Sequence, residues 1–558
     1  MMNTNTQTPV FGIDLGTTNT CIAVYSMAIN EPMVLSNLDS SPTTPSVLWV
    51  NKENNDEIVV GKEAKSELGS SESVNCIRGS KRLLAKNEFW TADGIFKDNT
   101  YPEVHGVQLT PQSVASEIIK AVIGKTPYVL ENVKDGKPKV VVTFPAYFTD
   151  EAKARTQQAI EKSGVVEYID MIEEPVAAAY SYVYKMSPAE RANKKVFVYD
   201  WGGGTFDASI VAFDSEGKVG KVIAKEGNDS LGGQDCDNDI AWWLWTQYCQ
   251  EVEKAGSRPK VKLEKKDFDT DKTSNSVEVV KLVGKFREYA EAAKVDLNSK
   301  PKTRVIHGEI EIQLTREKFD AEIRSRLEAT FDKVAATLDA GKIENTQIDM
   351  VCLVGGSTLM PCVREELEKT FSWQGKCLLN DPHEAVAKGA AIYANQKVNS
   401  GKEKFEGALT IKNIANLSYG IQTVDEKGEE QITNLIFKGD VLPATVTRDN
   451  FVTFRDWQSE VHIRVFTSDS KVEDCKFNED LFHELTNPDQ ESNLLKFERP
   501  VPKGTPIEVT YTLESSGLLK VVGKSKVCRG YCEFQIRPGG VLSDEKFIAL
   551  RDKMKGSN

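Results

Sequence analysis

The chain has 558 residues, a net charge of −13 at pH 7, 40% apolar residues and 27% charged residues. This composition excludes a collagen, a mucin-like stalk and a wholly disordered chain. The acidic balance also argues against a nucleic-acid partner bound over a broadly basic surface. No apolar run approaches the ~20 residues that cross a bilayer. The first eight residues carry no export signal, so we expect a cytoplasmic protein that does not partner with a membrane.

Strand-like and helix-like segments alternate through the first 395 residues. Runs rich in apolar and β-branched residues predict strands at 10–13, 20–25, 140–144, 196–199, 208–213 and 350–354. Helical spacing of apolar residues predicts helices at 111–123, 150–163, 174–184, 231–255, 276–297 and 315–340. This interleaving predicts an α/β domain over residues 9–395 whose sheets are covered by helices.

The pattern changes after a polar, lysine- and glycine-containing linker at 396–412. Short apolar runs separated by turn signals then predict an antiparallel β-sandwich over residues 413–541. The last segment, 542–558, begins with Ser, Asp and Glu, which favour a helix start, so we expect one short helix there.

Two segments of the α/β region repeat one pattern. Residues 10–25 and 196–213 each contain an apolar strand that ends in an aspartate, a turn of glycine and threonine, and a second apolar strand. The aspartates are Asp14 and Asp200. A long duplicated α/β unit would make a two-lobed structure with a cleft between the two related hairpins.

Gly/Thr turns of this kind present backbone N–H groups to an anion at close range. Asp14 and Asp200 would repel that anion, so the pattern implies a divalent cation, for which Mg²⁺ is the expected ion. A third turn, 355–357, follows another apolar strand and suits a ribose or an α-phosphate. The chain has no G-x-x-x-x-G-K-[ST] motif and no G-x-G-x-x-G motif that opens a helix, so an actin-like nucleotide cleft fits best.

Longer motifs then become recognisable. The chain resembles the seventy-kilodalton heat-shock chaperones of the DnaK type, within the actin/hexokinase superfamily. The segments that carry this resemblance are GIDLGTTNT (12–20), TTPSV (43–47), VGKEAK (60–65), SKRLL (80–84), TFPAYFTDEA (143–152), EEPVAAAY (173–180), YDWGGGTFDASI (199–210), SLGGQDCDN (230–238), LVGGSTLMP (353–361), DPHEAVAKGAA (381–391), LSYGIQT (417–423) and PKGTPIEVTY (502–511).

The resemblance implies a two-lobed actin-like ATPase domain built from duplicated ribonuclease-H-like units, followed by an antiparallel β-sandwich that binds peptides. It implies ATP or ADP as ligand, Mg²⁺, and K⁺ as a further candidate ion. The matching catalytic positions are Lys81, Glu174, Asp200, Thr205 and Asp14, with Asp14 and Asp200 holding Mg²⁺ through waters. The matching nucleotide contacts are Gly16, Thr17, Thr18, Gly202, Gly203, Gly204, Asp207, Glu291, Lys294, Gly355, Gly356 and Ser357.

The same resemblance implies coupling between the two domains. Pro145 and Lys153 match the proline and the basic residue that transmit the nucleotide state to the β-domain. Ile432, Phe451 and Val461 lie near the peptide groove, although a role as ordinary sandwich core is equally compatible with their sequence. The implied partners are unfolded or extended apolar peptides, a nucleotide-exchange factor and a J-domain co-chaperone.

Several positions depart from the family pattern. Leu359 and Val295 stand where side chains stack on the adenine, and the first of them replaces an arginine. Asp170, Glu173 and Val176 replace the Arg, Asn and Thr of the usual J-domain face, so we expect ordinary J-domains to bind poorly. Most of the helical lid is missing, and the linker is less apolar than usual. These departures leave two alternatives open: a regulatory ATP-binding homologue with weak hydrolysis and no peptide cycle, or, less favoured because of the β-domain, a sugar kinase.

Overall fold

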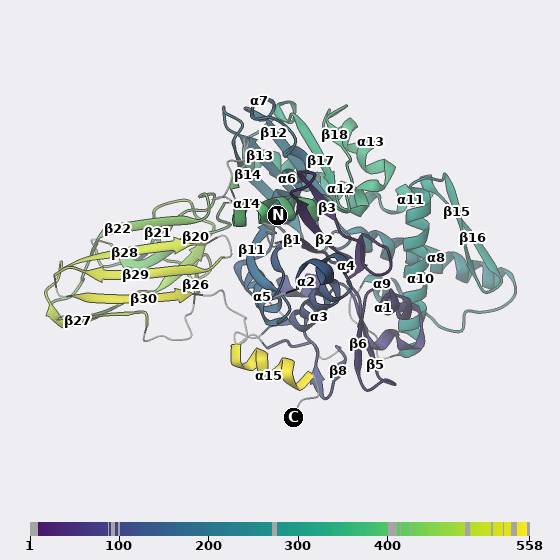
Figure 1. The fold of residues 1–558 in the computed structure, drawn as a ribbon, viewed down its shortest axis with the longest axis horizontal. Coiled ribbons are helices and arrows are strands. Elements are labelled where there is room, and N and C mark those ends of the chain that lie inside the picture. The colour runs from purple at the N-terminus through teal and green to yellow at the C-terminus, as the bar shows by residue number, and fades with distance from the viewer. Residues whose placement is uncertain are drawn as a thin grey trace, which may run out of the picture.

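The computed structural model describes residues 9–86, 89–90, 95–98, 101–134, 136–269, 276–399, 410–412, 414–425, 427–485, 492–514, 517–527, 529–536 and 544–554 (Figure 1). Helices and strands alternate up to residue 399, and strands predominate from residue 410 onward. Across these described ranges, no helix combines the length and apolarity needed to cross a membrane.

The first large sheet contains the first aspartate-ending strand. Its strand order is β11-β10-β1-β2-β3, with β4 paired to β2. The β1 strand runs antiparallel to β2 and parallel to β10. The strands are β1 (Val10–Leu15), β2 (Asn19–Ser26), β3 (Glu31–Val34), β4 (Thr43–Pro45), β10 (Lys139–Phe144) and β11 (Glu167–Glu173).

The second large sheet contains the second aspartate-ending strand and has the order β18-β17-β12-β13-β14-β19. Here β12 runs antiparallel to β13 and parallel to β17, the same pairing pattern that β1 makes with β2 and β10. The strands are β12 (Lys195–Trp201), β13 (Phe206–Phe213), β14 (Val219–Asn228), β17 (Met350–Val354), β18 (Cys377–Leu378) and β19 (Thr410–Lys412).

Two helices, α6 (Glu174–Val183) and α14 (Ala385–Asn399), share one apolar core with both sheets. Val141 of the first sheet and Val198 of the second belong to this core. The two helices approach so closely that a Cβ on Gly389 would lie 1.6 Å from the carbonyl oxygen of Ala177. Small residues on α6 and α14 therefore allow the two sheets to be joined through a thin, fully buried layer.

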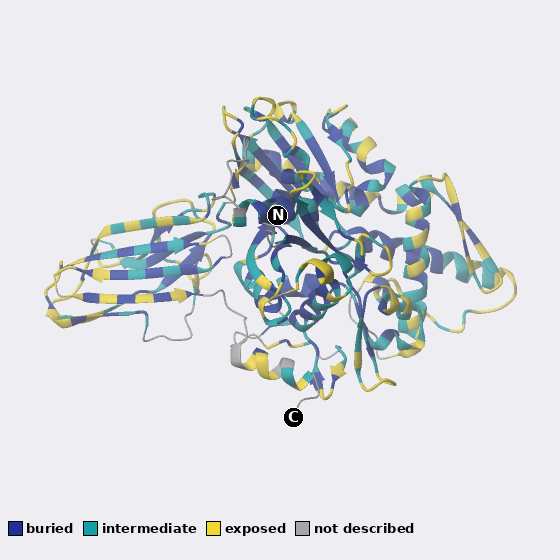
Figure 2. Cartoon of the chain, in the orientation of Figure 1, coloured by how far each residue is buried: buried dark blue, intermediate teal, exposed yellow. Residues whose placement is uncertain are grey.

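Further helices cover the outer faces of the two sheets, where the strands are buried (Figure 2). The first sheet packs with α2 (Ser80–Ala85), α3 (Pro111–Gly124), α4 (Pro127–Asn132) and α5 (Asp150–Lys162). A small sheet joins the same core and consists of β5 (Leu48–Asn51), β6 (Glu57–Val60) and β7 (Cys76–Ile77). The second sheet packs with α8 (Gly233–Lys254), α10 (Val277–Leu297), α11 (Arg316–Glu322), α12 (Arg324–Gly341), α13 (Pro361–Thr370) and the hairpin of β15 (Lys302–His307) and β16 (Ile310–Thr315). The α1 (Lys62–Ser66), α7 (Pro188–Arg191) and α9 (Lys265–Asp269) helices are short.

The C-terminal β region consists of two antiparallel sheets that share one core. Its strands alternate between buried and exposed residues, as β30 does along its whole length (Figure 2). One sheet has β20 (Ser418–Val424), β21 (Glu430–Ile436), β24 (Val465–Ser468), β25 (Asp474–Lys476) and β26 (His483–Leu485). The other has β22 (Ala444–Val452), β23 (Gln458–His462), β27 (Leu494–Val501), β28 (Pro506–Leu513), β29 (Leu519–Ser525) and β30 (Gly530–Ile536). This is the antiparallel sandwich that the short strands predict.

Two segments connect the β region to the α/β region. Residues 410–412 form β19, which pairs in parallel with β14 and is the last strand of the second large sheet. The more apolar part of the linker, 405–409, lies outside the described residues. The terminal helix α15 (Asp544–Met554) lies beside β8 (Glu103–Val104) and β9 (Val107–Gln108), and Met554 packs against the core of the first sheet (Figure 1).

One predicted helix differs from the structure. The single helix expected at 315–340 is two helices, α11 and α12, which meet at Ile323. Thr315 ends β16, and its side chain caps α11 by accepting from the backbone N–H of Lys318. Ile323 is fully buried, and its backbone leaves helical geometry. This break between α11 and α12 lets the Ile323 side chain enter the core, which one continuous helix would not allow.

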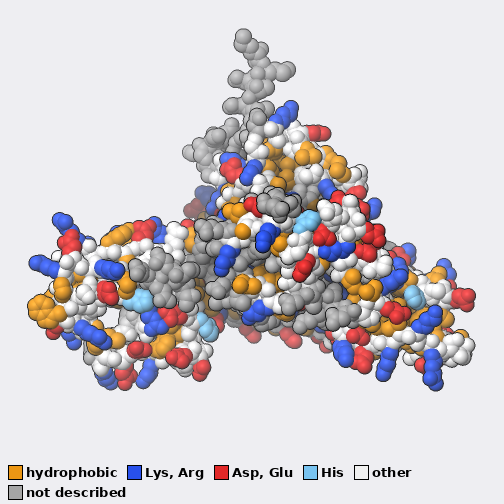
Figure 3. Space-filling model, turned by 90° about the horizontal axis from the view of Figure 1, so that it is seen from below, with side chains coloured by type: hydrophobic (Ala, Val, Ile, Leu, Met, Phe, Trp, Pro, Cys, Tyr) orange, Lys and Arg blue, Asp and Glu red, His pale blue; other side chains and the backbone are white. Residues whose placement is uncertain are grey.

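The surface mixes charges of both signs. The face in Figure 3 shows acidic and basic side chains interspersed over the described residues rather than separated into large single-sign areas. Such mixing agrees with the many exposed ion pairs, which each contribute little to stability.

Candidate nucleotide site

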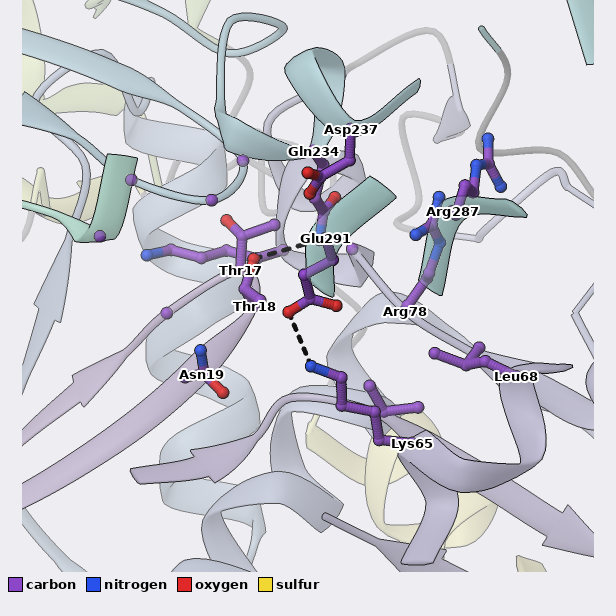
Figure 4. Close-up of a pocket in the computed structure, with 18 of the residues that line it drawn as sticks. Thr17, Thr18, Asn19, Lys65, Leu68, Arg78, Gln234, Asp237, Arg287 and Glu291 are labelled. Carbon is purple, nitrogen blue, oxygen red and sulfur yellow. Dashed lines mark hydrogen bonds and ion pairs between the residues drawn. The ribbon is translucent and has the colours of Figure 1, made fainter. Parts of the chain in front are cut away.

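A cavity of about 770 Å³ opens between the two large sheets and is lined by residues from both (Figure 4). Its walls include the turn after β1, the turn between β12 and β13, and the turn after β17. The α2, α8 and α10 helices complete the walls. The three glycine-containing turns singled out from the sequence therefore meet at one cavity.

The first two turns contact each other directly. A Cβ on Gly203 would lie 1.9 Å from the hydroxyl oxygen of Thr18, and one on Gly204 would lie 2.3 Å from a methyl carbon of Thr17. Only glycine allows this approach, because any side chain would collide with the opposite turn. Gly355 adopts a φ of +82°, which opens the third turn toward the same cavity. Backbone N–H groups from two separate hairpins are thus brought within reach of one anion.

Four carboxylates lie together here: Glu174, Asp200 and Asp207 are buried and Asp14 is half-buried, and Asp14, Glu174 and Asp200 line the cavity. Burial and the nearby charge of Glu174 raise the pKa of Asp14 to about 7. The same two causes raise the pKa values of Asp200 and Asp207 well above the ordinary range. One oxygen of Asp207 is buried without a hydrogen-bond partner. Burying several carboxylates close together costs free energy unless cations lie among them. This set of oxygen donors therefore fits a hard divalent ion.

No group of three or more His, Cys, Asp or Glu side chains that could hold a metal directly occurs within the described ranges. In general, Mg²⁺ keeps several waters and is bound through one or two carboxylates and substrate phosphates. The carboxylates are also held in place by neutral donors. Thr143 donates to Asp14 at 3.0 Å, and the backbone N–H of Ala146 donates to Asp207 at 3.0 Å.

Lys81 is the cation nearest to this cluster. It lies on α2, is 6% exposed, and forms an ion pair with Glu174. Its charge lowers the pKa values of Asp14, Asp200 and Asp207 against the effect of burial. Lys81 is therefore a buried cation of the cavity and not a solvated surface cation.

The neighbouring Arg82 has a different role. It is 3% exposed, donates to the carbonyl of Gly204 at 2.7 Å and pairs with Asp235 at 2.6 Å. These bonds connect α2, which packs with the first large sheet, to the second glycine turn and to α8. Nothing in the local sequence around Arg82 indicated either partner, since both lie more than 100 residues away.

The far end of the cavity contains a second set of paired charges. Lys294 pairs with Asp237 at 2.7 Å, and Lys65 of α1 pairs with Glu291 of α10 at 2.7 Å across the cavity (Figure 4). Ser357 donates to the carbonyl of Gly202 at 3.0 Å, which ties the third turn to the second. Leu359 and Val295, the two departures from the family pattern, also line the cavity.

Comparison with known proteins decides the family. The family model described as "Hsp70 protein" matches residues 10–557. A relative from Dictyostelium discoideum, "Heat shock 70 kDa protein, mitochondrial", is 32% identical over 567 residues, covering 97% of this chain and 77% of that protein. The chain belongs to the Hsp70 family. It is an ATP-dependent chaperone and an ATPase, as its resemblance implied.

Hsp70 proteins bind ATP or ADP with Mg²⁺, and they bind unfolded peptides and co-chaperones. The expected cytoplasmic location is contradicted. The printed name of the Dictyostelium relative places that protein in mitochondria, which contradicts the cytoplasmic location expected here. Net charge and hydropathy do not distinguish these compartments, because a folded chaperone exposes the same kind of surface to water in both.

The two candidate coupling residues, Pro145 and Lys153, lie before and within α5, the helix whose first residue contacts the β region. Lys153 is buried and pairs with Asp150 at 3.0 Å. Asp150 in turn accepts a hydrogen bond from the hydroxyl of Tyr419 on β20 of the sandwich. Pro145 directly precedes Ala146, whose N–H holds Asp207 in the cavity. One contact therefore joins the neighbour of Pro145 to the carboxylate cluster, and another joins the partner of Lys153 to the β region, where Tyr419 is a residue that sequence reasoning missed.

The acidic residues at the J-domain positions are engaged within the chain itself. Asp170 accepts from the hydroxyl of Tyr393 at 2.8 Å and pairs with Lys397 at 2.7 Å, whereas Glu173 pairs with Lys225 at 2.6 Å. Val176 is buried in α6.

The three candidate groove residues are distributed over the sandwich. Ile432 is fully buried in a small cluster with Phe466 and Phe482. Phe451 and Val461 are partly buried against the main sandwich core.

Proposed function

We propose that the cavity hydrolyses ATP by positioning a water in line with the γ-phosphate, with the residues of the two Gly/Thr turns holding the phosphates. The observation that carries this proposal is the gathering of Asp14, Glu174, Asp200 and Asp207 near Lys81, all but Asp14 fully buried, beside two turns that contact each other. Gly16, Thr17, Thr18, Gly202, Gly203, Gly204 and Thr205 would cradle the phosphates.

In this proposal Asp14 and Asp200 hold Mg²⁺ through its waters, and Glu174 and Asp207 orient those waters. The ion would supply charge neutralisation for the transferred phosphate. Lys81 stabilises the charge that develops on the γ-phosphate oxygens, and the protein contributes positioning and electrostatics rather than a covalent step. K⁺ is a further proposed ion.

The proposed base and ribose contacts are at the other end of the cavity. Glu291 and Lys294 of α10 would bind the ribose hydroxyls, and Gly355, Gly356 and Ser357 would contact the adenosine. Leu359 and Val295 would hold the base by apolar contact. An apolar clamp lacks the cation–π attraction of an arginine, so it favours weaker nucleotide binding than the usual family pattern.

We further propose the domain boundaries 9–395 for the ATPase domain, 396–412 for the linker, 413–541 for the peptide-binding sandwich and 542–558 for the start of a lid helix. The matching pairing patterns of β1 and β12 support an origin of the ATPase domain from two copies of one unit. In the sandwich, Ile432, Phe451 and Val461 remain the proposed groove residues. The bound peptide would lie extended and pair by its main chain.

Proposed partners are an exchange factor, which releases ADP, and a J-domain protein whose binding is weak. The chaperone cycle is favoured over a purely regulatory ATP-binding role because the catalytic set is intact. Single-turnover ATP hydrolysis, measured with and without an apolar peptide, tests this. Hydrolysis that peptide accelerates supports the proposal. Bound ATP that is not hydrolysed under either condition would favour the regulatory alternative.

A further inference from the structure

The turn between β18 and α14 carries His383, which lines the nucleotide cavity. Its imidazole packs against the third turn of the cavity. A Cβ on Gly356 would lie 2.3 Å from Cε1 of the ring, 3.0 Å from Nδ1 and 3.3 Å from Nε2. Glycine at this position therefore leaves the space that the ring occupies, and both ring nitrogens lie beside the turn. The nucleotide contacts proposed so far do not include this side chain.

The backbone around His383 is held in place by hydrogen bonds. The N–H of Gly355 donates to the carbonyl of Pro382 at 3.0 Å, and the N–H of Glu384 donates to the carbonyl of Asp381 at 2.8 Å. The ring itself makes no hydrogen bond to any other residue that the structure describes, and the side chain is exposed at the cavity wall. The ring is thus positioned by its backbone, and its nitrogens are available to a ligand in the cavity.

The acidic residues next to His383 in the chain are paired with a lysine. Asp381 and Glu384 each pair with Lys388 of α14 at 2.8 Å. Desolvation of the ring is the largest influence on His383 and lowers its pKa below the usual value, while the charge of Glu384 raises the pKa. Without a ligand, the ring is therefore mostly neutral at about pH 7.

The other charged groups near the third turn have partners of their own. Asp200 lies against Gly355, whose Cβ would be 2.8 Å from a carboxylate oxygen, and it is one of the two proposed Mg²⁺ carboxylates. Lys294 of α10 lines the same cavity and pairs with Asp237 at 2.7 Å. Among these groups, His383 is the one that can gain a positive charge in response to an anion beside the third turn.

The third turn joins the adenosine end of the cavity to the second phosphate turn. A Cβ on Gly355 would lie 2.3 Å from the carbonyl oxygen of Trp201, which directly precedes that phosphate turn. Ser357 donates to the carbonyl of Gly202 within it at 3.0 Å. In an adenine nucleotide, the α-phosphate is the group that joins the adenosine to the other phosphates. His383 therefore lies beside the place that the α-phosphate would occupy.

We propose that His383 is a further nucleotide-binding residue, whose ring donates a hydrogen bond to the α-phosphate and binds it more tightly when the ring is protonated. This inference rests on the proposed placement of the nucleotide. The protonated imidazole donates from both nitrogens, whereas the neutral ring has one donor. A hydrogen bond from a charged donor to a phosphate is roughly twice as strong as a neutral one. Nucleotide affinity through this contact therefore rises as the pH falls.

The pH range of the effect follows from the two states of the chain. A bound phosphate raises the pKa of His383 from its lowered value in the free chain, because the negative charge favours the protonated ring. The gain in affinity is fully present below the free-chain pKa and is lost as the pH rises above the bound-state pKa. Measurements at about pH 6 and about pH 8 span this change.

The test compares the dissociation constant of ADP for the native chain and for His383→Gln at these two pH values. The ratio of variant to native should be about fivefold or more at the lower pH, and less than about twofold at the higher pH. The carboxyl of Asp14, with a pKa of about 7, and the terminal phosphate of ADP also titrate in this range. Both are present in the two measurements, so their effects cancel in the ratio.

A purely structural role for His383 would change ADP affinity by the same factor at both pH values. A ratio that is equal at the two pH values therefore overturns the proposal. His462→Gln is the matched control, because it removes an exposed histidine on β23 of the sandwich, outside the cavity wall, and its ratio should be one at both pH values. Failure of the native chain to bind ADP at either pH would contradict the proposed function itself.

AMP and adenosine, measured as competitors of ADP, locate the contact on the nucleotide. AMP should show the same pH-dependent ratio as ADP, because it retains the α-phosphate, and adenosine should show none. If adenosine shows the pH-dependent ratio, the ring contacts the base or the ribose. If ADP shows it and AMP does not, the ring contacts the β-phosphate. Either result overturns the assignment of His383 to the α-phosphate.

Discussion

Replacement of Lys81 by methionine tests the catalytic assignment most directly. The side chain is 6% exposed, pairs with Glu174, and lowers the pKa values of Asp14, Asp200 and Asp207. Methionine keeps the apolar stem and removes the charge. Loss of one preorganised group that stabilises transition-state charge typically lowers the rate by about 10²–10³, or about 2.7–4 kcal/mol. We expect a reduction of this size in the single-turnover rate of ATP hydrolysis.

The same change leaves Glu174 buried without its partner, and breaking a buried pair costs about 3–5 kcal/mol of folding stability. A loss of rate caused by unfolding must therefore be separated from a loss of catalysis. The double variant Lys81→Met with Glu174→Gln removes both charges, so it should recover most of the melting temperature. If Lys81 acts on the phosphate, this variant should remain slow.

The matched control is Lys120→Met on α3, which removes a lysine that pairs with Glu117 in the same lobe but outside the cavity wall. Its hydrolysis rate should equal that of the native chain. A Lys81→Met variant that is folded, binds ATP and hydrolyses it within about twofold of the native rate would refute the reasoning, since that change is far below 2.7 kcal/mol.

Three further outcomes are expected. Chelation of Mg²⁺ should weaken ATP binding about tenfold or more in a titration, because the carboxylates of Asp14 and Asp200 then face the polyphosphate directly. Equal ATP affinity with and without the chelator would contradict the assignment of these two residues. Tyr419→Phe removes the hydroxyl that donates to Asp150 and should reduce the stimulation of ATP hydrolysis by peptide, since a hydrogen bond to a charged group contributes about 1.5–3 kcal/mol. Stimulation equal to that of the native chain would exclude this contact from the coupling between the two regions. An ordinary J-domain should accelerate hydrolysis less than about twofold, because Asp170 and Glu173 stand where the family offers an arginine and an asparagine, and both are occupied by ion pairs within the chain. A large acceleration of the native chain would overturn this.

Some of this site could be recognised from the sequence alone. Asp14 and Asp200 each end an apolar strand and precede a glycine turn, and these local patterns predict both the hairpins and their affinity for anions. Such features depend on residues only a few positions apart, so they are visible without knowledge of the fold. The sandwich strands were predictable for the same reason, because alternation of buried and exposed residues has a period of two.

Other features depended on long-range contacts. Thr143 donates to Asp14 across 129 residues, Arg82 pairs with Asp235 across 153, and Lys65 pairs with Glu291 across 226. Tyr419 reaches Asp150 across 269 residues. No local spacing distinguishes these side chains from ordinary polar residues, and Lys81 was picked out by the family motif rather than by its own local pattern.

The sequence by itself therefore determined which segments form strands, which turns can bind phosphate, and that an α/β region precedes a β region. The tertiary structure alone decided which charges share a buried space, and so which carboxylates have raised pKa values. It also decided that Arg78 and Arg287 line one end of the same cavity. The physical reason is that propensity and turn chemistry act between neighbours in the chain, whereas electrostatic interaction depends on distance in space and on burial.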